Sequence, residues 1–478
     1  MATHTFLWHD YETFGLKTRR DRPAQFAAIR TDAELNEIGA PIMLYCQPAS
    51  DYLPDPQSCL ITGITPQHCL QNGIREHQFA AQIEQAFSQA GTIGVGYNTI
   101  RFDDEVTRFL FWRNLIDPYA REWQNNCGRW DILDMVRTTY ALRPEGINWP
   151  KHEDGRPSFR LEQLTAANGI SHTAAHDALS DVRATIALAR LIRQHQPKLF
   201  EFCLALHKKE RVSAEIGWPL QKPFLHVSGM FPAERGCIAP MWPLAAHPGN
   251  KNEIIAWDLT CDPAELATLD AATIRRRMFS KTEDLPEGMT RLPIKSIHLN
   301  KSPVVIGNLK TLSNEMAGRW GVNLDLAQQF AVTAADLPDL SNIWRAVFQR
   351  PETEAVIDVD EDLYGGFVSN DDRRTLDHLR TLAPEQLAST HVSFTDTRLK
   401  ELLWRYRARN FPHTLSSEET ATWEAHRAAR LFDGAAGART IDALFGEIDT
   451  LSENADEHGE EVLGALYDYA EMIAPVRH

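Results

Sequence analysis

A short apolar segment near the start of the chain runs directly into two acidic residues. Residues 6–8 are apolar, and the next five read HDYET, which places Asp10 and Glu12 two positions apart. Successive side chains of a β-strand point to opposite faces, so both carboxylates lie on one face. Such a pair repels itself unless a cation lies between, and oxygen ligands suit Mg²⁺ or Mn²⁺. The pattern predicts a strand that ends in a metal site; these residues alone also fit a solvated strand edge.

Two later segments each add a carboxylate. In GYNTIRFDDE a strand ends and a helix begins, which places Asp103 in a first helical turn. The helix dipole favours an acid there in any case. In AHDALSD we expect Asp177 to cap a helix that begins at Ala178, with Asp181 one turn inside and His176 in the preceding loop. On its own, such a histidine is most simply a surface residue.

The pattern of apolar residues along the chain indicates three regions. Residues 1–196 show strands first and then mixed helices and strands, which is typical of an α/β layer domain. Residues 197–351 hold short strand-like pieces separated by prolines and glycines, which predicts a small β-barrel-like domain with two or three short helices. Residues 352–473 have helical spacing throughout.

Local periodicity also predicts individual elements. In the first region we expect strands over 25–31, 38–47 and 92–97, and helices over 79–87, 102–115, 130–142, 159–168 and 178–195. In the second region we expect strands over 224–227, 254–259, 294–299 and 303–306, with helices near 265–277 and 324–330.

The charge balance at first argues against a nucleic-acid-binding protein. The 478 residues include 65 acidic and 49 basic side chains, a formal net charge of −16. This sign disfavours bulk attraction to nucleic acid or to an anionic membrane. The charge is uneven, however, because residues 431–478 are strongly acidic while residues 271–310 and 398–411 are net basic. We therefore expect an acidic C-terminal tail and a local basic track.

The cysteines and the N-terminal segment indicate the cellular compartment of the protein. Seven cysteines form no C-x-x-C pair, which argues against a cysteine-zinc site or a disulfide framework and fits a reducing compartment. Neither a signal peptide nor an apolar run of membrane-spanning length is apparent. We expect a cytoplasmic protein with no membrane contact. Nothing indicates an obligate oligomer, so we also expect a monomer.

Taken together, the acidic segments resemble the DEDD exonucleases, in the subfamily that carries a histidine. The likeness extends over essentially the whole chain and is specific to bacterial exonuclease I. Its motifs are HDYETFG, GYNTIRFDDEVTR, SFRLEQLTAANGI, AHDALSDV, KPFLHVSGMF and WRYRARNFP; residues 233–241 and the last five residues fit less well. The resemblance implies an α/β ribonuclease H-like exonuclease domain, then a small SH3-like β-barrel domain and an all-helical C-terminal domain.

The resemblance also implies an activity. Members of this family remove nucleoside 5′-monophosphates processively from the 3′ end of single-stranded DNA, in DNA repair and recombination. Two Mg²⁺ ions, for which Mn²⁺ can substitute, are implied at Asp10, Glu12, Asp103 and Asp181. The fifth catalytic residue is His176, which can accept a proton from the attacking water because an ordinary histidine has a pKa near ~6.5.

Contacts to DNA and to a protein partner are implied as well. The positions that match DNA-facing positions of the family are Glu12, Arg108, Tyr119, Trp123, Arg137, Arg160, His176, Asn252, Lys295, His298 and Tyr364. Residues 403–411 interleave aromatic rings with arginines, a composition that suits a single strand. Each ring is equally compatible with core packing, and each arginine with a solvated face. Arg143, Phe202 and Lys222 match positions near the pocket for the acidic, apolar C-terminal tail of single-stranded DNA-binding protein.

Two other functions are considered beside this one. The first is a DEDD nuclease that acts on RNA or proofreads for a polymerase; the whole-chain resemblance and the lack of a polymerase domain disfavour it. The second is a non-catalytic scaffold that binds single-stranded DNA. The presence of all five catalytic residues argues against the scaffold.

Overall fold

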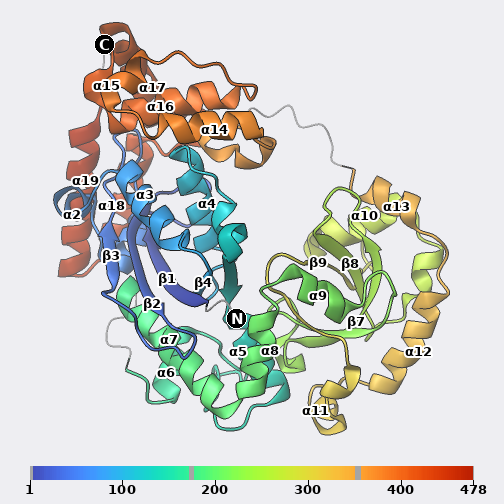
Figure 1. Cartoon of the computed structure of the whole chain (residues 1–478). Helices are drawn as coiled ribbons and strands as arrows, with labels where there is room; N and C mark the ends of the chain where they lie inside the picture. Colours follow the sequence, from blue (N-terminus) through green and yellow to red (C-terminus); the bar gives the residue numbers. More distant parts are fainter. Residues whose placement is uncertain (1–3, 172–176, 350–356, 477–478) are drawn as a thin grey trace. The chain divides into compact units, whose positions relative to one another are not determined.

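The computed structural model describes residues 4–171, 177–349 and 357–476 (Figure 1). The chain forms two compact units. The first lies within Met1–Gly128, His172–Arg183 and Ala355–His478, and the second within Arg129–Ser171 and Ala184–Glu354. Among the helices of the described ranges, none has the length and apolar character needed to cross a membrane.

A five-stranded sheet holds the first acidic segment. Its order is β3-β2-β1-β4-β5, with β1 antiparallel to β2 and parallel to β4. The strands are β1 (Thr5–Thr13), β2 (Pro23–Thr31), β3 (Ile42–Tyr45), β4 (Thr92–Gly96) and β5 (Gly128–Asp131). The strands expected over 25–31 and 92–97 are confirmed, whereas β3 is shorter than expected. The expectation of a helix from residue 130 was wrong at its start, because a four-residue buried strand has no periodicity that separates it from a helix.

Helices cover this sheet. They are α1 (Pro56–Thr62), α2 (Pro66–Asn72), α3 (Glu76–Phe87), α4 (Asp103–Arg113) and α7 (Ala178–His195), with 3-10 turns η1 (Ala120–Glu122) and η2 (Gln124–Asn126). The helix expected over 178–195 is confirmed at both ends. Leu7 of β1, Phe79 of α3 and Leu110 of α4 belong to one buried cluster, so α3 and α4 pack on one face of the sheet.

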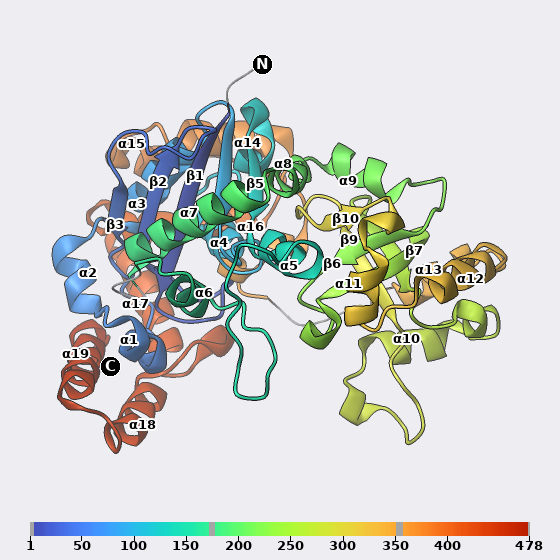
Figure 2. The same cartoon turned by 90° about the horizontal axis from the view of Figure 1, so that it is seen from below.

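The C-terminal region of the first unit is helical, as expected. Its helices are α14 (Asn370–Leu379), α15 (Pro384–Ser389), α16 (Arg398–Asn410), α17 (Ser417–Leu431), α18 (Ile441–Ser452) and α19 (Glu457–Ile473), with 3-10 turns η7 (Val359–Glu361), η8 (Leu363–Gly365), η9 (Pro412–Thr414) and η10 (Ala435–Gly437). In Figure 2, α18 and α19 lie beside α1, and Leu444 and Leu466 share a buried cluster with Phe14 and Tyr52. The acidic segment at the end of the chain is thus part of the docked helices, and local net charge does not reveal the apolar stripe that docks them.

The second unit is built on an antiparallel sheet of order β10-β6-β7-β8-β9. Its strands are β6 (Phe224–Val227), β7 (Ile238–Ala246), β8 (Glu253–Asp258), β9 (Ile294–His298) and β10 (Val304–Ile306). The strand expected over 224–227 is confirmed. The long strand β7 was not expected, because Pro240 and Pro243 interrupt its pattern. A register shift between Pro243 and Ala245 accommodates the second proline.

This unit is more helical than the sequence indicated. Its helices are α5 (Leu133–Leu142), α6 (Leu161–Ala167), α8 (Pro197–Ala205), α9 (Lys209–Ile216), α10 (Ala271–Phe279), α11 (Asn314–Arg319), α12 (Leu324–Ala335) and α13 (Ser341–Val347), with 3-10 turns η3 (Ala233–Arg235), η4 (Pro263–Ala267), η5 (Thr282–Asp284) and η6 (Leu309–Thr311). Pro197 is the first residue of α8, a position where its missing N–H costs no hydrogen bond.

Candidate functional site

Three carboxylates meet beside strand β1. Asp10, Glu12 and Asp181 each offer an oxygen, and these oxygens lie within 4.8 Å of one another. Asp10 and Glu12 come from one face of β1, as the alternation of strand side chains predicts. Asp181 comes from the first turn of α7, which Asp177 caps by accepting a hydrogen bond from the Ser180 N–H at 3.2 Å. The expected cap thus places Asp181 against the strand.

Asp103 completes the acidic group. It is the first residue of α4 and is only 4% exposed. Its Oδ1 accepts a hydrogen bond from the backbone N–H of Tyr11 at 3.1 Å. The charge of Asp103 raises the pKa of both Asp10 and Glu12, so it lies within electrostatic reach of them. The structure therefore brings together the four carboxylates that the sequence singled out.

The electrostatics of this group fit a cation. Burial is the largest cause that raises the pKa of Asp10 well above its ordinary value, followed by the charges of Asp103, Glu12 and Asp181. Burial, then Asp181 and Asp103, raises the pKa of Glu12 to about 8. Burial and mutual repulsion therefore disfavour ionisation of these carboxylates when no cation opposes them. A divalent cation favours the ionised carboxylates and relieves this repulsion, so the donor set fits a hard metal ion.

The acids and the histidine next to these residues have a different role. Asp104 directly follows Asp103 but forms a buried ion pair with Arg121 at 2.5 Å. His9 directly precedes Asp10, and burial, followed by the charge of Arg121, lowers its pKa to about 4. Both residues are therefore buried next to the acidic group and belong to its surroundings. The sequence did not predict their part in it, since it does not show which of two adjacent residues faces the other carboxylates.

His176 lies outside the residues that the structure describes. Its neighbour Asp177 is described and immediately precedes α7. The role expected for His176 therefore stays a prediction.

Three of the expected DNA-binding residues cluster on the first unit. The guanidinium of Arg108 lies 5.2 Å from the ring centroid of Tyr119 and donates a hydrogen bond to the Tyr364 hydroxyl at 3.1 Å. Arg108 is 5% exposed and also pairs with Glu105 and Glu122, at 2.7 and 2.8 Å. Its charge is thus already compensated by two carboxylates. Tyr364 in turn donates to Glu105 at 2.5 Å.

The other expected DNA contacts occupy several places. Trp123 of the first unit is 64% exposed between η1 and η2. In the second unit, Arg160 is exposed at the start of α6, and Arg137 pairs with Asp134 at 2.6 Å.

Three further positions lie on or beside β8 and β9 of the second unit. The Lys295 amine lies 4.5 Å from the ring centroid of Phe231. Asn252 accepts a hydrogen bond through its backbone carbonyl from the Leu299 N–H at 2.8 Å, directly beside His298.

The residues expected to bind a protein partner also lie in the second unit, on or beside three different elements. Arg143 is exposed where α5 ends, and Lys222 is exposed before β6. Phe202 lies in α8, with the guanidinium of Arg211 5.7 Å from its ring centroid.

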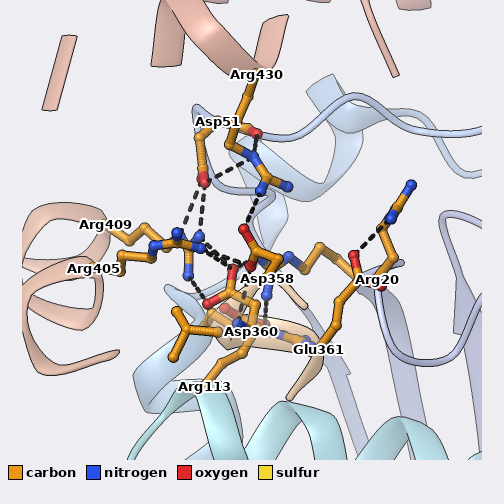
Figure 3. Close-up of polar contacts among 12 residues, drawn as sticks. Arg20, Asp51, Arg113, Asp358, Asp360, Glu361, Arg405, Arg409 and Arg430 are labelled. Carbon is orange, nitrogen blue, oxygen red and sulfur yellow. Dashed lines mark hydrogen bonds and ion pairs between the residues drawn. The ribbon is translucent and has the colours of Figure 1, made fainter. Parts of the chain in front are cut away.

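The aromatic and arginine-rich stretch 403–411 does not offer its arginines to DNA. Figure 3 shows that Arg405 and Arg409 of α16 point toward buried carboxylates. Arg409 pairs with Asp51 at 2.7 Å and with Asp360 at 2.6 Å, and Arg405 pairs with Asp358 at 2.7 Å. The expectation of a basic track here was wrong, because interleaved rings and arginines do not indicate whether they face solvent or a neighbouring acidic loop.

The pKa values of these carboxylates are shifted in the opposite direction to those of Asp10 and Glu12. Burial acts to raise the pKa of Asp51 and of Asp360, but the charge of Arg409, added to those of neighbouring arginines and to hydrogen bonds, outweighs it and holds both pKa values well below the ordinary value. Both aspartates therefore remain ionised at neutral pH. The cluster joins the loop at Asp51 to the C-terminal helices. The complementary spacing of DVDED at 358–362 and RYRAR at 405–409 is the signal that could have identified it.

Comparisons with known proteins agree with this architecture. Residues 7–189 match the family model described as Exonuclease, residues 207–350 the Exonuclease I SH3-like domain, and residues 357–473 the Exonuclease I C-terminal domain. Exodeoxyribonuclease I of Escherichia coli (strain K12) is 45% identical over 475 residues, 98% of each chain.

Solved structures give the same result. A moderately thermophilic exonuclease I from Methylocaldum szegediense is 47% identical with a TM-score of 0.93, over 98% of this chain and 99% of that one. E. coli exonuclease I in complex with a dA16 oligonucleotide is 43% identical with a TM-score of 0.91, over 98% and 100%. The expected order of an exonuclease domain, an SH3-like domain and a helical C-terminal domain is confirmed. The chain belongs to the exonuclease I family.

Proposed function

We propose that this chain is a processive 3′-5′ exonuclease that degrades single-stranded DNA to nucleoside 5′-monophosphates, in DNA repair and recombination. The observation that carries the proposal is the convergence of Asp10, Glu12 and Asp181 within 4.8 Å, with Asp103 beside them. Membership of the exonuclease I family supports the substrate, since an E. coli relative has been solved with a DNA oligonucleotide.

The four carboxylates are proposed to hold two Mg²⁺ ions, with Mn²⁺ as a substitute. A zinc-bound form of the E. coli exonuclease I complex with single-stranded DNA supports metal binding in the family. Such ions stabilise the charge that develops on a phosphate under attack. Asp10 and Glu12 bind from one rigid strand, and the Tyr11 N–H holds Asp103 in place. The imidazole of His176 accepts the proton of the attacking water; its place directly before Asp177 supports this role.

The remaining site residues keep roles that the family suggests. We assign DNA binding to Glu12, His176 and the set Arg108, Tyr119, Trp123, Arg137, Arg160, Asn252, Lys295, His298 and Tyr364. We assign binding of the C-terminal tail of single-stranded DNA-binding protein to Arg143, Phe202 and Lys222; a solved E. coli complex named SSB/Exonuclease I supports such a partner. The proposed domains are 1–196, 197–351 and 352–473, in a cytoplasmic monomer.

The test uses oligonucleotides that carry a label at either end. We expect the full chain with Mg²⁺ to release mononucleotides from the 3′ end of single-stranded DNA and not from duplex DNA or RNA. Asp10→Ala should lose turnover and retain DNA binding. Asp371→Asn is the matched control, because the Asp371 side chain is 84% exposed. Full cleavage by Asp10→Ala in Mg²⁺ would refute the assignment, and degradation of RNA at the same rate would favour an RNA nuclease.

A further inference from the structure

The loop between β1 and β2 carries three arginines in the sequence GLKTRRDR, and two of them form ion pairs with carboxylates. Arg20 pairs with Glu361 at 2.7 Å, and Arg22 is buried and pairs with Asp360 at 3.1 Å. Arg19 is exposed, and no carboxylate of the described residues forms an ion pair with it. Arg20 and Arg22 thus anchor the end of the loop that follows Arg19, while the charge of Arg19 has no carboxylate partner among the described residues.

Aromatic rings hold the Arg19 side chain in place. Its guanidinium lies 5.5 Å from the ring centroid of Tyr364 and 6.0 Å from that of Phe109. Phe109 is fully buried in α4, while Tyr364 is 41% exposed. A guanidinium that stacks on a ring keeps its N–H groups available at the edge, in a planar arrangement that suits a phosphate.

The position of Arg19 relates it to the proposed substrate-binding residues. Tyr364 hydrogen-bonds both Glu105 and Arg108 of α4, the helix that begins at Asp103. The loop itself directly continues β1, the strand that carries Asp10 and Glu12. Arg19 therefore lies at the same surface as Tyr364, on a segment that leads straight out of the acidic site.

Arg19 changes the charge balance of the surface around Tyr364. Arg108 is a single cation that pairs with two carboxylates, Glu105 and Glu122, so these three side chains have a net negative charge. These three side chains alone do not supply a net positive charge for a phosphate. Arg19 adds the positive charge that the group lacks, and it adds it at the exposed ring of Tyr364.

We propose that Arg19 is a further substrate-binding residue, which binds a backbone phosphate of single-stranded DNA beside the nucleotide that contacts Tyr364. This inference rests on the proposed function. Because the contact is made outside the carboxylate group, Arg19 contributes to affinity and to the salt dependence of binding, and it leaves the chemical step unchanged.

Binding of a fluorescent dT16 oligonucleotide to the full chain in EDTA tests the proposal without turnover. We expect Arg19→Ala to raise Kd about 3- to 10-fold and to reduce the slope of log K against log salt by about 0.7, the value for one phosphate contact on a single strand. Arg19→Lys should restore the slope but only part of the affinity, because lysine lacks the planar stacked group.

The control is Arg374→Ala, which removes an equally charged side chain that is 78% exposed on α14. An unchanged Kd and salt slope in Arg19→Ala would overturn the proposal, and so would an equal loss in Arg374→Ala, which would indicate bulk charge alone. Failure of the proposed function looks different. A wild-type chain that shows the Arg19-dependent slope but releases no mononucleotide in Mg²⁺ would refute the exonuclease and keep the Arg19 contact; a wild-type chain that does not bind would refute both.

Discussion

The first unit contains two groups of buried carboxylates with opposite properties. Around Asp10 and Glu12 the acids face one another, and burial together with their mutual repulsion raises their pKa values. Around Asp51 and Asp360 the acids face Arg409 and its neighbours, and their pKa values are held well below the ordinary range despite burial. The two groups contain the same residue type in the same unit, and they differ in which side chains oppose them.

This difference distinguishes a metal-binding site, at Asp10 and Glu12, from a structural ion-pair network, at Asp51 and Asp360. Buried acids without cationic side chains are costly to ionise, and they become stable when a metal ion supplies the charge. Buried acids that already have arginine partners need no ligand and hold two parts of the chain together. Four changes test this distinction, in order of decreasing effect.

The largest effect is expected at Asp10. Asp10→Asn removes one metal-binding oxygen charge and should reduce turnover by about 1,000-fold or more, since the metal supplies most of the charge stabilisation. Binding of single-stranded DNA in EDTA should change less than about twofold. Single-turnover kinetics and an EDTA binding titration measure the two quantities. A parallel loss of binding would indicate misfolding instead of a lost metal ligand.

Removal of Arg409 should destabilise the ion-pair network. Arg409→Ala leaves Asp51 and Asp360 buried without their main partner, which costs about 3–5 kcal/mol of unfolding free energy. Urea unfolding of the full chain measures the change. The exposed control Arg374→Ala should change it by less than about 0.5 kcal/mol. Equal stability of Arg409→Ala and wild type would show that the network does not hold the C-terminal helices.

The pH dependence of stability should distinguish the two groups. The folded metal-free chain keeps the Glu12 proton up to a pKa of about 8, while the unfolded chain loses it near the ordinary value of 4.5. The folded state thus binds more protons in this window, and the free energy of unfolding falls as pH rises, by at most ~1.4 kcal/mol per pH unit for one group.

Urea unfolding in EDTA between about pH 5 and about pH 9 measures this slope. It should flatten in Glu12→Gln and in wild type with saturating Mg²⁺, and it should persist in Asp371→Asn. Asp360 adds no slope in this range, because its lowered pKa gives stability that is fully present above the ordinary value of 3.8 and is lost only as pH falls below it. A slope that Glu12→Gln does not alter would contradict the raised pKa of Glu12.

The smallest effect is expected from a neighbour of Arg409 on the same helix. Arg407 pairs with Glu419 at 2.8 Å, but the Glu419 side chain is 32% exposed. Arg407→Ala should therefore cost less than about 1 kcal/mol in urea unfolding, as is usual for a partly solvated pair. A loss of unfolding free energy as large as that of Arg409→Ala would show that burial does not explain the strength of the ion-pair network.

Some elements of this chain can be predicted from the sequence and others cannot. The helix over 178–195 was expected at its true ends because it combines a cap, Asp177, with a long apolar stripe. Strand β7 was missed because its prolines remove the alternation on which the prediction depends. The stretch 403–411 was misread because its composition is the same whether its arginines meet phosphates or carboxylates.

Residue types at motif positions are enough to predict the family, the order of the domains and the four candidate metal ligands. Which charges are already neutralised follows only from the fold. Arg409 and Arg19 are alike as residues, yet one is buried against two aspartates and the other lies exposed on a tyrosine ring. The physical reason is that an electrostatic role depends on burial and on partners distant in sequence, such as Asp51 for Arg409 and Tyr364 for Arg19.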